Sequence, residues 1–118
     1  MFGATSEPVK ADINDVTASR VDDVIYQNTL SRPMMVIISF KSTHPALGDN
    51  AYFRCLIGAT SPPTIATSRA GLGPAGATGD DFFFTMMFVV PPNYYYLADD
   101  ILFGTGAVTI LSWIEVEL

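Results

Sequence analysis

Short runs of β-branched and aromatic residues, each closed by proline, glycine, asparagine or aspartate, follow one another along most of this chain. Such runs, separated by turn signals about every ten residues, are typical of antiparallel all-β domains. No stretch has a helical period, apart from one turn expected near residues 13–18 with Asp12 as its cap. The expected strands cover residues 24–29, 34–41, 51–57, 64–68, 82–90, 94–97 and 107–118.

This pattern predicts an all-β fold, a single antiparallel β-sandwich of the jelly-roll type, over residues 21–118. Residues 1–20 are the most polar part of the chain and have no sustained period, so we expect an extended N-terminal arm that docks on a partner. Pro62 and Pro63 restrict the strand that follows them to a sheet edge. Asn93 is expected in the left-handed conformation after two prolines, and a break is expected at residues 99–100.

The last predicted strand, residues 107–118, alternates cleanly between two sets of side chains. One set contains Ile110, Ser112 and Ile114, and the other contains Leu111 and Trp113. Because side chains alternate across a strand, the first set is expected to face the core. The predicted core residues are Val36, Ile38, Phe40, Phe88, Val90, Ile110 and Ile114.

Composition narrows the classes of function. A chain of 118 residues can bury one core, and its hydrophobic content of 49% argues against disorder. A net charge of −6 argues against nucleic-acid binding, which needs clustered basic residues. No apolar run approaches the roughly 20 residues that a membrane helix needs, so no membrane insertion is expected. Charged residues make up only 15%, which favours permanent contact with other subunits.

Residues with chemical reactivity are sparse, and they predict neither an enzyme nor a cofactor. Cys55 lies within a predicted strand and His44 lies in a loop, which argues against a catalytic pair or a transition-metal site. The segment 71–76 matches a dinucleotide-binding glycine pattern but leaves no room for the helix that this chemistry needs. Pairs of aspartates at 22–23, 80–81 and 99–100 leave calcium binding open.

Aromatic and glycine-rich segments are the candidate contact residues. Residues 82–84 are three phenylalanines and residues 94–96 are three tyrosines. In a strand the middle ring of each run points opposite to its neighbours, so each run has at least one ring that does not face the core. Such a ring can serve a subunit interface or a sugar-binding platform. A glycine-rich loop, residues 70–79, is a second candidate for receptor contact. The candidate receptor or interface residues are Tyr94, Tyr95, Tyr96, Trp113, Gly73 and Gly76.

Four short segments carry a resemblance through their order and spacing. They are residues 15–20 (DVTASR), 26–33 (Tyr-x-Asn-Thr, then Arg-Pro), 88–95 (Phe-x-Val-Pro-Pro-x-x-Tyr) and 112–115 (Ser-Trp-x-Glu). Together they resemble the small β-sandwich module at the C-terminal ends of tailed-bacteriophage tail fibres and related virion proteins. Asn93 stands where those modules usually have glycine, a mild departure because asparagine tolerates the same backbone conformation.

The resemblance implies a non-enzymatic virion structural protein, a homotrimer that takes part in host attachment. Its expected partners are other copies of itself, other virion proteins reached through the N-terminal arm, and a host surface glycan. Tail-fibre modules commonly end a long fibre, whereas only a short arm precedes the module here, so a capsid decoration protein is an alternative. A carbohydrate-binding module that uses Tyr94, Tyr96 or Trp113 is another.

Overall fold

The computed structural model describes residues 12–43, 50–72 and 81–118. These residues form eight strands and one 3-10 turn, η1, and none of them forms a helix long and apolar enough to cross a membrane. The elements are β1 (Ile13–Asp15), η1 (Thr17–Ser19), β2 (Ile25–Gln27), β3 (Met34–Thr43), β4 (Asn50–Gly58), β5 (Ile65–Leu72), β6 (Asp81–Val90), β7 (Tyr95–Phe103) and β8 (Ala107–Glu117).

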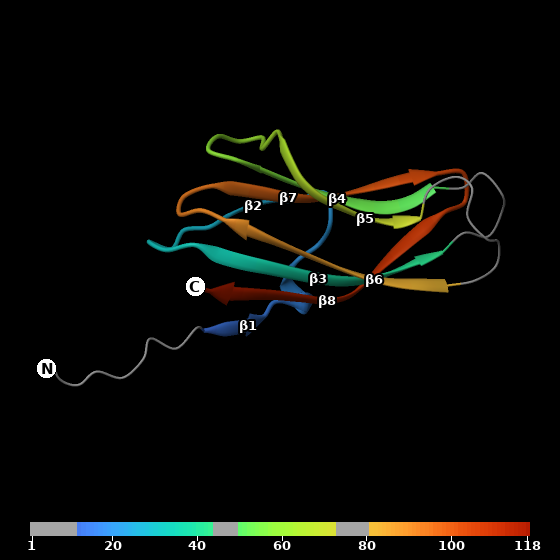
Figure 1. Ribbon diagram of the computed structural model, residues 1–118, viewed down its shortest axis with the longest axis horizontal. Coiled ribbons are helices and arrows are strands. Elements are labelled where there is room, and N and C mark those ends of the chain that lie inside the picture. The colour runs from blue at the N-terminus through green and yellow to red at the C-terminus, as the bar shows by residue number, and fades with distance from the viewer. Residues whose placement is uncertain (1–11, 44–49, 73–80) are drawn as a thin grey trace, which may run out of the picture.

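The strands form two antiparallel four-stranded sheets that pack face to face (Figure 1). Sheet A has the order β1-β8-β3-β6, and sheet B has the order β2-β7-β4-β5. Every connection carries the chain from one sheet to the other, except the one between β4 and β5. Eight strands in this order form a jelly roll. The predicted all-β sandwich of the jelly-roll type is confirmed.

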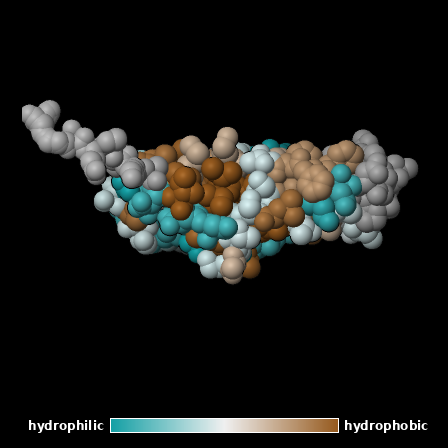
Figure 2. Space-filling model, turned by 90° about the horizontal axis from the view of Figure 1, so that it is seen from below, coloured by the Kyte–Doolittle hydropathy of each residue, from teal (hydrophilic) through white to brown (hydrophobic). Residues whose placement is uncertain are grey.

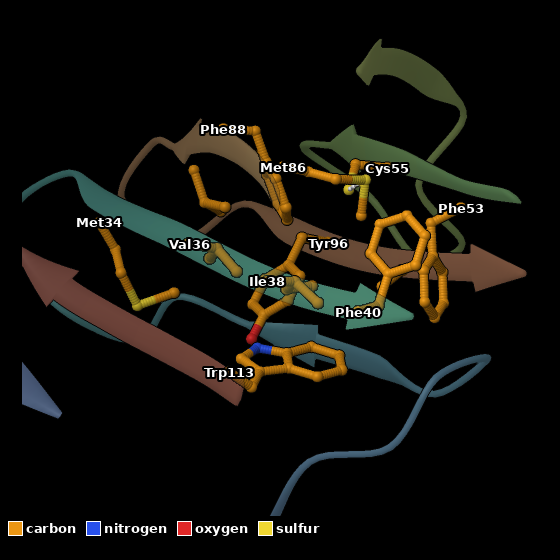
Figure 3. Close-up of a cluster of buried hydrophobic side chains, with 12 residues drawn as sticks. Met34, Val36, Ile38, Phe40, Phe53, Cys55, Met86, Phe88, Tyr96 and Trp113 are labelled. Carbon is orange, nitrogen blue, oxygen red and sulfur yellow. Dashed lines mark hydrogen bonds between the residues drawn. The ribbon is translucent and has the colours of Figure 1, made fainter. Parts of the chain in front are cut away.

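The core lies between the sheets and is centred on β3, whose side chains alternate between the core and the outer face of sheet A. Phe40 of β3 meets Phe53 of β4 edge to face, with ring centroids 4.7 Å apart, so the two sheets interlock at this point (Figure 3). The predicted core residues that are buried are Val36, Ile38, Phe40, Phe88 and Val90.

A β-bulge interrupts β8 where it pairs with β3. Ser39 pairs with Ser112, but the next residue, Phe40, pairs with Ile110. Leu111 is therefore the extra residue, and its side chain is exposed. An extra residue reverses the alternation of side chains on either side of it.

Because of the bulge, some side chains of residues 107–118 face the opposite side from the one predicted. Ile110, before the bulge, packs against the core and is half-buried. After the bulge Trp113 faces the core and is completely buried, and Ile114 is on the outer face. The prediction of Ile114 as a core residue is wrong, because strict alternation was assumed through the strand.

Several element boundaries in the structure differ from the predicted ones. β1 and η1 lie within residues 1–20, so the sandwich begins at residue 13, earlier than predicted, and residues 1–11 lie outside the described part of the chain. The break expected at residues 99–100 is wrong, because β7 continues through both aspartates to Phe103. β5 is an edge strand, as the two prolines before it predict, and Asn93 has the expected left-handed conformation with φ of 66°.

Candidate functional site

An ion pair joins the segment after η1 to β8 at one side of the core. The Arg20 guanidinium donates two hydrogen bonds of 3.1 Å to the Glu115 carboxylate, from Nε and from Nη2. Both side chains are largely buried, with exposed fractions of 24% and 11%. Burial lowers the pKa of Arg20, but hydrogen bonds and charge interactions with Glu115 and Tyr96 together outweigh that effect and raise the pKa overall. The Arg20 guanidinium is therefore charged at neutral pH.

Aromatic rings surround this ion pair. The Tyr96 hydroxyl donates to Glu115 Oε2, and burial, together with that carboxylate, raises the pKa of Tyr96. The Arg20 guanidinium lies over the Tyr26 ring at 4.5 Å from the centroid, and Trp113 meets the same ring edge-on at 5.9 Å. The cluster has the construction of a structural anchor, because Arg20, Glu115 and the Tyr96 hydroxyl are paired with one another inside the protein. The buried Trp113 Nε1 has no hydrogen-bond partner among the described residues.

This cluster corrects the expectation for two of the candidate contact residues. Tyr96 and Trp113 are completely buried, and Figure 3 shows both rings pointing into the core. Neither can form an exposed sugar-binding platform. The physical reasons are the position of Tyr96 on the inward face of β7 and the bulge that turns Trp113 inward. Trp113 also accepts at its carbonyl from Val16 N at 2.9 Å, which ties β8 to the chain before η1.

The other aromatic candidates are partly accessible. Tyr94 packs against the core cluster, and Tyr95 is half-buried and points opposite to Tyr96. In the phenylalanine run, Phe83 is exposed whereas Phe84 packs against the core. The alternation expected within both runs is therefore observed, with the middle ring off the core face. Gly73 and Gly76 lie outside the described residues.

Asn28 is a second structural anchor, which sequence reasoning did not single out as a site. It is almost fully buried, and its Nδ2 donates to the carbonyls of Arg32 and Val90, both at 3.0 Å. Its Oδ1 accepts from Leu30 N, and its backbone bonds to Asn93 and Tyr94. Asn28 thus joins the two ends of the connection between β2 and β3 to the turn between β6 and β7.

The four segments that carry the resemblance meet around these two anchors. Arg20, Asn28 and Glu115 supply the polar contacts, and the segment 88–95 supplies the carbonyls that Asn28 binds. The signal that could have identified the anchors was present in the sequence, since each lies within a quoted segment. These contacts give Arg20, Asn28 and Glu115 a role in holding the folded structure together.

Three carboxylates come together beside the start of β2. Those of Asp22, Asp23 and Asp100 lie within 4.8 Å of one another. None of the ion pairs found among the described residues includes them; the neighbouring Asp99 is paired with Arg54, and Asp81 lies elsewhere, paired with Lys41. Burial and the neighbouring carboxyl groups raise the pKa of Asp100 to about 8.

This acidic cluster offers one oxygen per residue, three in all, to a cation. Calcium takes six to eight oxygen ligands, so one oxygen from each of the three side chains supplies at most half of a calcium shell. The raised pKa of Asp100 has a sufficient cause in carboxyl groups that share a confined space.

Cys55 is buried in the core, where its thiol lies 3.6 Å from the Met86 sulfur. Burial raises the pKa of Cys55 to about 12, so the thiol stays protonated and is a poor nucleophile. His44 lies outside the described residues.

Two hollows lie on the described surface: one of about 150 Å³ beside Arg20 and Asn28, and one of about 400 Å³ along β5 beside Arg54 and Arg69.

A further feature of the described surface is the outer face of sheet A, which sequence reasoning did not locate. Cross-strand pairing puts the outward side chains of β1, β8, β3 and β6 in rows. Two adjacent rows are apolar except at one edge, where Asp15 lies. Figure 2 shows hydrophobic side chains gathered on this side of the molecule. We name it the apolar face, formed by Ile13, Met35, Ile37, Met87, Val89, Ile114 and Val116.

The outer face of sheet B differs. Its central row is charged, because Asp99, Arg54 and Arg69 lie side by side across β7, β4 and β5. Water is the natural neighbour of such a row. A sequence signal for the contrast exists, since residues 34–38 and 86–90 are apolar at successive positions, but that pattern alone does not separate an inner from an outer face.

Comparison with known proteins finds no matching family model, no matching curated protein and no matching solved structure.

Proposed function

We propose that this protein is a non-enzymatic structural module of a tailed-phage virion, a surface module of the tail-fibre type that takes part in host attachment. The observation that carries the proposal is the apolar face, on which Ile13 is 71% exposed and Met87 is 60% exposed. Exposed apolar patches of this kind mark surfaces that are covered in the working assembly. A subunit of a particle has such a surface, and a free monomeric enzyme has little use for one.

Two further observations support the proposal. Jelly rolls serve in viral capsids and lectins, although a fold by itself does not fix a function. The segments that carry the resemblance form the structural anchors around Arg20, Asn28 and Glu115. The residues on which the resemblance rests are therefore residues that make the sandwich a rigid frame. A rigid frame that presents variable surfaces suits attachment to a particle and to a host.

Capsid decoration is the second candidate for the same apolar face, because a decoration protein also needs an apolar underside. A carbohydrate-binding role has less support, since two of its three candidate rings, Tyr96 and Trp113, are buried. Tyr94 remains only partly accessible.

The test is to locate and count the protein in particles. Antibodies against the recombinant chain would be used for immunogold labelling of purified virions, with copy number measured by quantitative mass spectrometry. We expect label at the tail and tens of copies per particle. Label over the head with hundreds of copies, and unchanged host adsorption without the protein, would assign decoration instead. Particles without the protein would contradict both roles.

A further inference from the structure

We propose that the apolar face binds the same face of other copies of this chain, an inference that rests on the proposed role as an assembly component. The face is continuous across all four strands of sheet A. In one row Ile13, Val116, Met35 and Val89 are neighbours from β1 to β6. A monomer would leave this row, and the one beside it, in contact with water.

The outer side of sheet A, of which the apolar face forms two rows, is large enough for a stable contact between subunits. β3 and β6 have 10 residues each and β8 has 11. Strands of that length span roughly 33 Å, and three of them cover roughly 14 Å in width, which gives the whole outer side a plan area on the order of 500 Å² before β1 is added. A stable interface buries about 800 Å² of accessible surface per partner, and side chains make the accessible area larger than the plan area.

The distribution of charge permits a like copy as the occupant. The chain has a net charge of −6, so two copies repel each other, and the repulsion is weakest when they meet through a surface without charged groups. On the outer side of sheet A, the charged residues lie at the margins. Asp15 is at the β1 edge, and Lys41 is paired with Asp81 at the far end at 3.7 Å. An apolar centre with a polar rim is the usual construction of a subunit interface.

The surface is also complementary to itself. Its neighbouring row is neutral and polar, formed by Ser112, Ser39 and Thr85, and the last two hydroxyl groups bond to each other at 3.0 Å. Two such faces can pack about 10 Å apart, as the two sheets of a sandwich do, without burying an unpaired charge. A symmetric contact requires one patch to match itself, and a patch without charged groups meets that requirement for charge.

The test is light scattering of the purified protein at micromolar concentration, with a matched pair of variants. Met87→Glu places a carboxylate within the apolar face, whereas Ile65→Glu places one on β5, at the edge of sheet B. The two side chains are similarly exposed, at 60% and 57%, and both lie on edge strands. Each substitution therefore makes the same change in charge, and only the first lies in the proposed contact.

We expect the parent protein and Ile65→Glu to have twice the 12.8 kDa chain mass, because a face that packs on the same face of another copy closes at two subunits. Met87→Glu should have the chain mass itself, with a dissociation constant raised about 100-fold or more. A parent protein of 12.8 kDa, or equal behaviour of the two variants, overturns the inference. If circular dichroism shows that Met87→Glu is unfolded, Ile13→Glu on β1 takes its place. Particle labelling is a separate readout, so an error about the interface is distinguishable from an error about the virion role.

Discussion

Glu115 on β8 accepts two hydrogen bonds of 3.1 Å from the Arg20 guanidinium, and through them the last strand is tied to the segment that follows η1. The two residues are far apart in the sequence, so this contact forms only when the jelly roll closes. The same carboxylate also accepts from Tyr96, which brings β7 into the junction. Stability should therefore be unusually sensitive to this carboxylate.

We expect Glu115→Gln to reduce the free energy of unfolding by about 2 to 3 kcal/mol. The substitution keeps the shape of the side chain but leaves the Arg20 guanidinium largely buried without its counter-charge. The measurement is urea unfolding followed by circular dichroism. The control is Lys41→Met, which removes a more exposed ion pair with Asp81 and should cost at most about 1 kcal/mol. Equal losses in the two variants would contradict the role of an anchor.

The acidic cluster makes stability depend on pH. The pKa of Asp100 is about 8 in the folded protein, above the value of about 3.9 expected in the unfolded chain. Between these values the folded state binds a proton that the unfolded state releases. The contribution of Asp100 to the stability of the folded protein is thus greatest below about pH 4, and it is lost as the pH rises through 8.

Asp100→Asn should remove that dependence, because it leaves Asp22 and Asp23 without the third carboxylate. We expect its melting temperature to exceed that of the parent protein at about pH 9, and the difference to shrink towards pH 5. Thermal unfolding across this range measures it. Asp81→Asn, at a distant paired carboxylate, is the control and should keep the slope of the parent protein. A parent protein whose stability rises from pH 5 to pH 9 would refute the assignment.

Gly71, near the end of β5, is predicted to tolerate no side chain. Its φ is +134°, and a Cβ atom there would lie 2.4 Å from Tyr52 Cα. We expect Gly71→Ala to destabilise the protein by about 2 kcal/mol or more in urea unfolding. Gly104 has a φ of 71°, a left-handed conformation that asparagine adopts, so Gly104→Asn should cost less than about 1 kcal/mol. A Gly71→Ala variant as stable as Gly104→Asn would contradict the assigned backbone strain.

Sequence patterns predicted the fold class because alternation and turn residues act locally. The alternation of β3, the edge position of β5 and the left-handed Asn93 all follow from such local rules. The position of Trp113 did not, because a bulge depends on how one strand meets its neighbour. The burial of Tyr96 was missed for a different reason, since the pattern fixes which rings share a face but not which face is inward.

The sequence could predict that a contact surface exists, but not where on the fold it lies. Low charge indicated that some surface would be covered, but the apolar face is defined by which strands neighbour one another in sheet A. Asp22, Asp23 and Asp100 likewise come together only through the pairing of distant segments. Pairing between segments far apart in the chain is the information that a single sequence does not carry.

The bulge itself leads to the last prediction, which concerns deletions in β8. Without Leu111, the strand would alternate without interruption, with Ile110, Trp113 and Glu115 all still facing the core. Deletion of Leu111 should therefore be tolerated, with a change in unfolding free energy below about 1.5 kcal/mol, because it removes only the unpaired residue.

Deletion of Ile114 is the matched control, since it also removes one residue of β8 from outside the core. It should turn Glu115 to the outer face and separate it from Arg20, at a cost above about 3 kcal/mol or with loss of folding. Urea unfolding of the two deletion variants, with near-ultraviolet circular dichroism to report the packing of Trp113, makes the comparison. If deletion of Leu111 is the more damaging of the two, the assigned register between Phe40 and Ile110 is wrong.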